Sequence, residues 1–118
     1  KILDTEIIER DSVARKYDDA FSKIAHIRIP RIPDNVRSAW AQYTIRSSKR
    51  DLIKKKLYEQ GYPSMVYYPI ALHKQLSVKS DVMMPNSSIL TQEVLSLPIY
   101  GTLPYNEQKE IIDIVCSV

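Results

Sequence analysis

The fold class of this 118-residue chain is decided by one stretch, Ala39-Trp40-Ala41-Gln42-Tyr43-Thr44-Ile45-Arg46. It is rich in the β-branched and aromatic residues that favour strands, and its apolar and polar positions alternate as they do in a strand with one buried face. The residues that we expect on the buried face are Ala39, Ala41, Tyr43 and Ile45. The sequence therefore predicts a strand over 39–46, and the neighbouring elements must cover its buried face.

A helix is predicted before this strand. Between residues 5 and 24, apolar residues recur at three- and four-residue steps, which indicates one apolar stripe on a helix. The stripe comprises Ile7, Ile8, Val13, Ala14, Tyr17, Ala20, Phe21 and Ile24. The charged residues between them, among them Asp11, Asp18 and Asp19, are expected to form a solvated face. The prolines of 30–35 forbid further helix and predict a connector to the strand.

A second helix and a second strand are predicted to follow. Ser48 is a candidate cap for the helix, and Gly61 suits the left-handed position after its last turn, with Pro63 making the end firm. Residues 64–68 resemble a strand, closed by Pro69.

The last third of the chain is predicted to contain shorter elements. The segment 70–84 is long and weakly patterned, which is typical of a functional or disordered loop. A short helix over 89–93 with its entry at 85–88, an extended piece over 94–97 and a final helix capped by Asn106 complete the order. The buried side of the final helix is expected to consist of Ile111, Ile112, Ile114 and Val115. This order predicts a two-layer α/β domain: a small mixed, mostly antiparallel sheet of about three strands with helices on one face.

The size and the single cysteine bound the domain count and the compartment. A chain this long can bury one core, so we expect a single domain, with a leading helix in 1–25 and an α/β core in 26–118. Cys116 cannot form an internal disulfide and is expected to be a half-buried, inert thiol, which favours the cytoplasm. We find no apolar run long enough to span a membrane and no signal-peptide pattern. Because there is no initiator methionine, we expect a piece of a longer protein.

Composition excludes several function classes. Two glycines, Gly61 and Gly101, leave no room for a glycine-rich phosphate loop. Two histidines and one cysteine cannot supply a zinc site without a carboxylate cluster, so no metal site is expected. The formal charge of +3 is small and mixed, so it demands neither a nucleic acid nor a membrane.

One stretch could carry binding chemistry. Tyr67, Tyr68 and His73 lie at the end of the predicted strand 64–68 and in the loop after it, where ligand-binding groups are often found. The alternative is that both tyrosines are ordinary amphipathic sheet residues and His73 is a surface loop residue.

A basic segment runs from Arg46 to Lys56. Its cations are Arg46, Lys49, Arg50, Lys54, Lys55 and Lys56. They could attract phosphates, but no aromatic residues are interleaved to stack bases, so a solvated helix face is the stronger interpretation and nucleic-acid binding the weaker one.

Five motifs in fixed order carry a family resemblance. They are Glu9-Arg10-Asp11-Ser12-Val13-Ala14-Arg15-Lys16-Tyr17; Ser38-Ala39-Trp40-Ala41-Gln42-Tyr43-Thr44-Ile45-Arg46; Arg50-Asp51-Leu52 with Leu57 and Gly61; Tyr67-Tyr68-Pro69 with Leu72-His73-Lys74-Gln75; and Glu93-Val94-Leu95-Ser96-Leu97-Pro98-Ile99-Tyr100. In this order they resemble the carboxyl-terminal small domain of the DegT/DnrJ/StrS nucleotide-sugar aminotransferases, which are pyridoxal-phosphate enzymes of the aspartate-aminotransferase fold (fold type I). The resemblance covers nearly the whole chain.

The resemblance implies an enzyme whose catalytic groups lie elsewhere. Family members transfer an amino group, usually from glutamate, to a keto group of a nucleotide-linked sugar, in surface-polysaccharide, lipopolysaccharide or deoxyaminosugar synthesis. The lysine that holds pyridoxal phosphate and the other cofactor-binding groups belong to a large domain that would precede Lys1. No lysine here matches the family's position, so the resemblance implies no catalytic and no cofactor-binding residue in this chain. Family members are typically homodimers.

The resemblance also implies substrate contacts from this domain. Tyr68 matches the tyrosine of the family's His-Tyr-Pro, whereas Tyr67 replaces its histidine; His73 matches the histidine of Pro-Leu-His-x-Gln, in which Ala71 replaces the proline. We therefore predict Tyr67, Tyr68 and His73 as substrate-binding residues.

Two further expectations accompany this prediction. The alternative function is a stand-alone binding or interaction domain that keeps the fold without catalysis. In either case, an isolated domain is expected to expose an apolar patch at the start of its first helix, made by Ile2, Leu3, Ile7 and Ile8.

Overall fold

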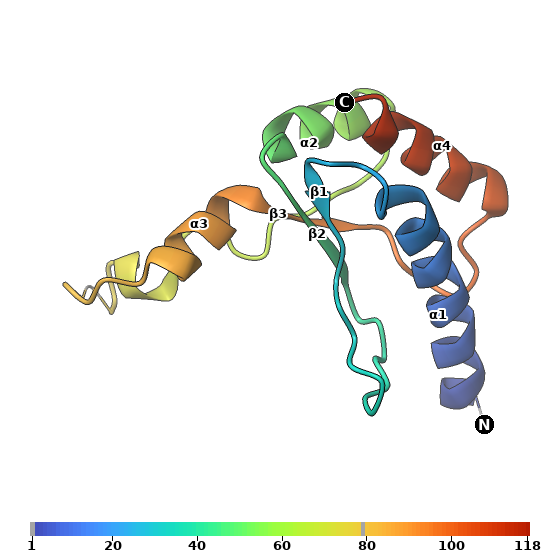
Figure 1. Cartoon of the computed structure of the whole chain (residues 1–118), viewed down its shortest axis with the longest axis horizontal. Helices are drawn as coiled ribbons and strands as arrows, with labels where there is room; N and C mark the ends of the chain where they lie inside the picture. Colours follow the sequence, from blue (N-terminus) through green and yellow to red (C-terminus); the bar gives the residue numbers. More distant parts are fainter. Residues whose placement is uncertain (1, 79) are drawn as a thin grey trace.

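The structure is a computed structural model and describes residues 2–78 and 80–118. Within them the elements follow in the order α1 (Ile2–Phe21), β1 (Ile27–Arg28), β2 (Tyr43–Ser47), α2 (Arg50–Glu59), the 3-10 helix η1 (Leu72–Lys74), α3 (Pro85–Glu93), β3 (Val94–Leu97) and α4 (Tyr105–Cys116). Figure 1 shows α1, α2 and α4 gathered around the strands, with α3 projecting away from them. None of these helices is long and apolar enough to cross a membrane.

The strands form one antiparallel sheet in the order β1-β2-β3. Tyr43 pairs with Leu97 and Ile45 with Leu95, so four large side chains share one face. On the other face, the Thr44 and Ser96 hydroxyl oxygens lie 2.8 Å apart. The prediction of an α/β fold with a small, mostly antiparallel sheet is confirmed.

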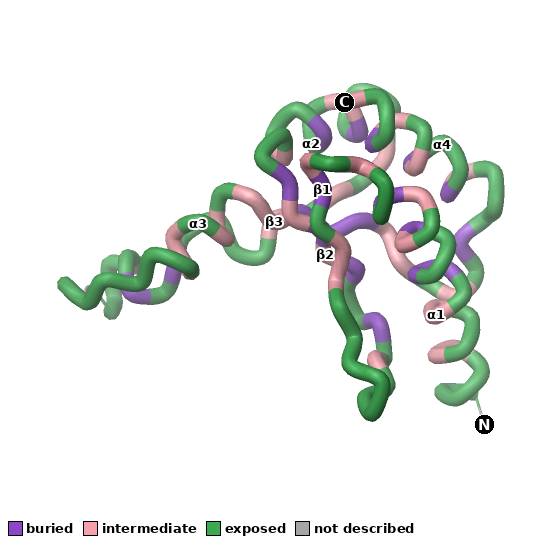
Figure 2. Tube along the Cα trace, in the orientation of Figure 1, coloured by how far each residue is buried: buried purple, intermediate pink, exposed green. Residues whose placement is uncertain are grey.

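The core lies between the sheet and three helices, where the buried residues gather in Figure 2. The helices contribute Val13, Ala14, Tyr17 and Phe21 from α1, Ile53 and Leu57 from α2, and Ile111 and Val115 from α4. The Tyr17 ring stacks on Phe21 at a centroid distance of 5.5 Å and lies 4.9 Å from the ring of Tyr43. The periodicity of the first helix correctly predicted four buried residues, Val13, Ala14, Tyr17 and Phe21. It was wrong for Ile8, which is exposed, and the other predicted residues of the stripe, Ile7, Ala20 and Ile24, are half-buried, as are Ile112 and Ile114 of α4.

The strand predicted over 39–46 begins only at Tyr43. Trp40 is buried with φ = 49°, in the left-handed region, while Ala39 and Ala41 are exposed, so the predicted alternation is wrong before Tyr43. In a regular strand Trp40 and Tyr43 would point to opposite faces. The chain leaves strand geometry at Trp40, and both aromatic rings then enter the same core, 5.7 Å apart.

The strand predicted over 64–68 is also wrong. One bridge forms there, in which Met65 and Ser96 exchange backbone hydrogen bonds of 3.0 and 2.7 Å. Pro63 and Pro69 bracket this segment and lack the N–H that a longer ladder needs. The pairing of β1 with β2 was not predicted, because β1 has only two residues and is too short to show an alternation of apolar and polar positions.

Helix ends were predicted with mixed success. Gly61 has φ = 80°, its N–H donates to Tyr58 O at 3.0 Å, and the Tyr62 N–H donates to Leu57 O at 2.9 Å, which confirms the glycine stop of α2. Ser48 and Asn106 are not caps: α2 follows Lys49 and α4 follows Pro104, neither with a side-chain cap.

Several apolar side chains stay exposed. At the start of α1, Ile2, Leu3 and Ile8 are exposed, as predicted for an isolated domain, and Ile7 is half-buried. Cys116 is exposed rather than half-buried, because it ends α4 on the side away from Ile111 and Val115.

The segment 70–93, which contains η1 and α3, extends from the body of the molecule (Figure 1). We call it the arm. The helix α3 has no buried residue, whereas Ala71 and His73, near the start of the arm, are buried.

Candidate functional site

Tyr67 and Tyr68 lie in the segment that leads from the Met65–Ser96 bridge into the arm. Both are exposed, by 42% and 70%, and their rings meet edge to face with centroids 5.8 Å apart. Tyr67 lines a cavity of about 310 Å³ together with Gln42 and the end of β3. Both phenol groups can therefore reach a ligand that lies outside this chain.

His73 occupies the middle of η1, on the arm. It is 8% exposed, so the interpretation of His73 as an ordinary surface loop residue is wrong. Its Nδ1 is buried and has no hydrogen-bond partner among the described residues. The residue lines a cavity of about 440 Å³ with Lys74, Ser80 and the first turns of α3. An unpaired nitrogen at this position is unfavourable, so a group that completes it would stabilise the arm.

The three predicted contact residues are not gathered into one pocket of this chain. Tyr67 faces the cavity at the end of β3, and His73 faces the cavity within the arm. A ligand that touches both residues must therefore span from the sheet to the arm.

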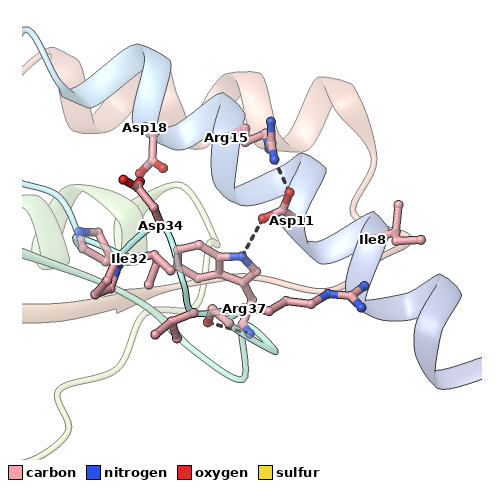
Figure 3. A pocket seen from close by; sticks show the side chains of 12 residues that line it. Ile8, Asp11, Arg15, Asp18, Ile32, Asp34 and Arg37 are labelled. Atoms are coloured by element: carbon pink, nitrogen blue, oxygen red, sulfur yellow. Dashed lines mark hydrogen bonds and ion pairs between the residues drawn. The ribbon is translucent and has the colours of Figure 1, made fainter.

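A larger cavity, of about 490 Å³, lies between α1 and the connector that leads to β2. Figure 3 shows Asp11 projecting from α1 on one side of it: one carboxylate oxygen accepts a hydrogen bond from Trp40 Nε1 at 3.0 Å and the other from Arg15 Nε at 2.8 Å. Two turns further along α1, Asp18 accepts a hydrogen bond from the Tyr43 hydroxyl at 2.6 Å. The two carboxylates thus fasten α1 to the aromatic residues that precede and begin β2.

The environments of these two carboxylates differ. The N–H of Trp40 is the main reason that the pKa of Asp11 is lowered, whereas burial raises the pKa of Asp18 in spite of its hydrogen bond from Tyr43. Burial, followed by the bond to Asp18, raises the pKa of Tyr43. The hydrogen bonds of Asp11 and Asp18 described above run to Trp40, Arg15 and Tyr43, so both carboxylates hold α1 against the segment that leads into β2.

The solvated face predicted for α1 is corrected by this geometry. Asp19 is exposed, but Asp11 and Asp18 are half-buried and hydrogen-bonded. The signal in the sequence was the pair Trp40 and Tyr43, because a buried indole N–H and a buried phenol O–H each need an acceptor. Within the described residues, no group of three or more His, Cys, Asp or Glu side chains could hold a metal ion.

The basic segment is mostly not a free cationic surface. Arg46 bonds Glu93, Arg50 bonds two backbone carbonyls and Asp51, and Lys56 bonds Ser117. Lys49 bonds the carbonyl oxygen of Val118. The prediction of a solvated helix face is confirmed for Lys54 and Lys55, which are exposed, whereas Lys56 is half-buried and bonded to Ser117.

Comparison with known proteins gives a consistent result. The model of the DegT/DnrJ/EryC1/StrS aminotransferase family matches residues 1–116. The chain is similar to UDP-2-acetamido-2-deoxy-3-oxo-D-glucuronate aminotransferase from Pseudomonas aeruginosa, with 34% identity over 99% of this chain and 32% of that protein. It is also similar to a pleiotropic regulatory protein from Geobacillus stearothermophilus, with 35% identity over 71% of this chain and 24% of that protein.

A solved structure shares the fold. The crystal structure of a DegT/DnrJ/EryC1/StrS aminotransferase from Brucella abortus has a TM-score of 0.87 and 36% identity, over 95% of this chain and 31% of that one. The chain therefore spans about a third of the length of the relatives that it matches.

Proposed function

Because the chain belongs to the DegT/DnrJ/EryC1/StrS aminotransferase family, we propose that it is the carboxyl-terminal domain of a pyridoxal-phosphate-dependent aminotransferase. The proposed substrate is a keto-sugar nucleotide, the amino donor is glutamate, and the compartment is the cytoplasm. The observation that carries the proposal is the match to the Pseudomonas aeruginosa aminotransferase over 99% of the chain.

The residues of this chain do not by themselves fit the cofactor. Pyridoxal phosphate needs a lysine amine held at its ring and groups that bind its phosphate. Every lysine that the structure describes is exposed except Lys56, which is half-buried and bonded to Ser117. Lys1 and Lys79 lie outside the described residues. We therefore propose that the cofactor is held by the remaining two thirds of the whole protein, and we derive no chemical step from this chain.

What this chain supplies, in our proposal, is one wall of the substrate site. The exposed hydroxyls of Tyr67 and Tyr68 can each donate a hydrogen bond to a sugar or phosphate oxygen. His73 would contact the substrate from the arm. At Tyr67 a phenol stands where the family has an imidazole, so this position binds without the positive charge that a histidine can carry.

Kinetics of the intact protein test the proposal. With glutamate and a panel of keto-sugar nucleotides, we expect amino-group transfer to at least one of them. Replacing Tyr68 by phenylalanine removes one hydrogen bond to the substrate and should raise KM about tenfold, as a bond to a charged oxygen is lost. Tyr58→Phe is the matched control, because Tyr58 is 82% exposed on α2 and should leave KM unchanged. Equal KM values for Tyr68→Phe and the unaltered enzyme would show that the Tyr68 hydroxyl makes no contact with the substrate.

The location of the cofactor is tested on the chain of 118 residues. When pyridoxal phosphate is added and the mixture is reduced with borohydride, we expect no specific lysine to be labelled. One lysine labelled in preference to all the others would show a cofactor site within this chain.

A second candidate function is a binding or interaction domain without catalysis. The similarity to a protein named as a pleiotropic regulatory protein favours it. The reading frame upstream of Lys1 separates the two functions. An aminotransferase requires a large domain with a cofactor lysine there, whereas an interaction domain does not.

A further inference from the structure

Two arginines join the arm to the body of the molecule. Arg46 of β2 donates to the same oxygen of Glu93, Oε2, from Nε at 3.1 Å and from Nη2 at 2.7 Å. Arg50, the first residue of α2, donates from Nη1 to the carbonyl oxygens of Val94 at 3.1 Å and Thr91 at 3.3 Å. The side chain of Arg50 is only 11% exposed, so its bonds to these two carbonyl oxygens are partly shielded from water.

Each arginine offsets an unfavourable feature of a helix end. Glu93 is an anion at the carboxyl end of α3, which already carries partial negative charge, and α3 has no basic residue of its own in its last turn. Arg46 neutralises this anion, since β2 and β3 are in register and place Arg46 opposite Val94. Arg50 satisfies Thr91 O in that last turn, together with Val94 O directly after it.

The positive charge of Arg50 is unfavourable at its position in its own helix, α2. A cation at the amino end of α2 faces partial positive charge, which Asp51 reduces by accepting a hydrogen bond from Arg50 Nε at 2.6 Å. The other bonds of Arg50, to the carbonyl oxygens of Thr91 and Val94, lie outside its own helix and serve another element. Here that element is the carboxyl end of α3.

Buried apolar contacts do not hold α3 to the body of the molecule. None of the nine residues of α3 is buried, and Figure 2 shows the helix standing clear of the buried core. The direction in which the arm leaves the sheet is therefore set by the backbone at its two ends and by the bonds of Arg46 and Arg50.

We propose that Arg46 and Arg50 are positioning residues, which hold the arm, and His73 on it, at a fixed place relative to the sheet and to Tyr67. This inference rests on the proposed function, in which His73 and Tyr67 contact one keto-sugar nucleotide. Because that ligand must span two separate cavities, its affinity depends on the distance between them. A loosened arm would have to be ordered during binding, which weakens binding without altering the groups that carry out the chemistry.

The test uses the intact protein and two readouts. In Arg50→Gln, hydrogen exchange of the amides in 72–93 should accelerate at least about tenfold while exchange in α1 and α4 stays unchanged, because bonds to a buried charged donor are lost. KM for the keto-sugar nucleotide should rise about tenfold, with kcat changed less than about threefold. Lys55→Gln is the matched control on the same helix, since Lys55 is exposed and its contact is a 3.8 Å ion pair with Glu59.

Exchanging the charges of Arg46 and Glu93 tests whether their ion pair holds the arm. Arg46→Glu places two carboxylates together at the base of the arm and should reproduce the faster exchange and the higher KM. Adding Glu93→Arg restores an opposite-charge pair and should return both readouts toward the unaltered protein. A merely structural role would instead accelerate exchange in α1 and α4 as well, and would change kcat together with KM.

Three results would overturn the inference: arm exchange that stays unchanged in Arg50→Gln, a freed arm with an unchanged KM, or no rescue by the charge exchange. Absence of aminotransferase activity in the unaltered protein would refute the proposed function and the substrate role of the arm together. Exchange of the arm would still show, in that case, whether the two arginines hold it.

Discussion

At the scale of single residues, Asp11 and Asp18 show how position decides the chemistry of identical side chains. Both lie on α1 and both accept a hydrogen bond from an aromatic residue. Asp11 also faces Arg15 and keeps 39% of its side chain exposed, so its charged form is favoured. Asp18 is desolvated and has Asp19 and Asp11 as anionic neighbours, so its charged form is disfavoured. The two carboxylates should therefore affect stability with opposite dependence on pH.

The sign follows from the direction of each pKa. The lowered pKa of Asp11 stabilises the fold above the unfolded value of 3.8, and this contribution is lost as pH falls through the folded value. The raised pKa of Asp18 stabilises the fold below 3.8, and this contribution is lost as pH rises through the folded value. Asp11→Asn should lower the free energy of unfolding by about 1 kcal/mol at pH 7, a value reduced by its exposure, and have little effect near pH 2.

Asp18→Asn is the companion variant, and we expect it to raise the free energy of unfolding at pH 7 by up to about 1 kcal/mol. The amide keeps an oxygen acceptor for Tyr43 while the desolvated charge is removed. Both variants are measured by urea denaturation of the 118-residue chain between pH 2 and pH 7, followed through the fluorescence of its one tryptophan, Trp40. If Asp18→Asn destabilises the chain at pH 7, the charged bond to Tyr43 outweighs burial.

At the scale of elements, Gly101 shows that a loop can be as tightly packed as the core. A Cβ added there would lie 2.3 Å from Glu9 Oε2 and 2.9 Å from Glu9 Cβ. The carboxylate can move away, but Cβ is fixed to the backbone of α1. We therefore expect Gly101→Ala to destabilise the chain by about 1–3 kcal/mol in urea denaturation, as overpacking does.

Gly61→Ala is the control for the glycine itself. No atom lies within 4 Å of the added Cβ, and the cost is the positive φ of the helix stop, which is about 1 kcal/mol for alanine. Adding Glu9→Ala to Gly101→Ala should recover part of the loss and adding it to Gly61→Ala should recover none. Recovery in both backgrounds would mean that Glu9 is unfavourable for another reason.

Gln108 joins α4 to α1 and gives another element-scale prediction. It is 1% exposed, its Nε2 donates to Val13 O at 2.8 Å, and its buried Oε1 has no partner among the described residues. Gln108→Ala should cost about 2–4 kcal/mol, because it loses the bond and opens a cavity. Gln108→Met keeps the volume and removes the unpaired oxygen, so it should cost less than about 1.5 kcal/mol. Thermal unfolding measures the stability of both variants. Equal destabilisation by the two substitutions would show that the hydrogen bond of Gln108 contributes more than its packing.

The sequence predicted the elements whose pattern is local and missed those set by distant contacts. The buried residues of α1 from Val13 to Phe21, the glycine stop of α2 and the extended residues 94–97 are properties of neighbouring residues, and the structure bears them out. The start of β2 is set by Trp40, whose indole reaches Asp11 across 29 residues, and no local pattern contains that bond. The same holds for the bonds of Arg46 and Arg50, whose partners Glu93 and Val94 lie more than 40 residues further along the chain.

The candidate site follows the same rule. The exposure of Tyr67 and Tyr68 fits a segment between two prolines, which cannot continue as a strand. The burial of His73 could not be predicted, because it depends on how residues 80–88 fold back over η1, where the backbone N–H of Ser80 donates to His73 O at 3.0 Å. A weakly patterned loop in the sequence is thus a short, self-packed unit in the structure.

At the scale of the whole molecule, two of the segments that carry several exposed apolar side chains stand out. One is the start of α1, and the other is the arm, where Leu76 is 95% exposed and Met83 is 87% exposed. Ordinary surfaces carry such residues singly, and clusters of them mark contacts with other polypeptide. The well-packed core between α1, α2, α4 and the sheet does not depend on either cluster. Folding stability and self-association of the 118-residue chain should therefore be separable.

The double variant Leu76→Glu, Met83→Glu tests this separation. Neither side chain packs on the core, so the free energy of unfolding should change by less than about 0.5 kcal/mol. Sedimentation velocity at rising concentration should show weaker self-association, because two charges interrupt the apolar surface of the arm. Tyr58→Glu adds a charge at an equally exposed aromatic residue on α2 and should leave association unchanged. If association persists in the double variant, the apolar start of α1 is the surface through which copies of the chain meet, and Ile2→Glu should then abolish it.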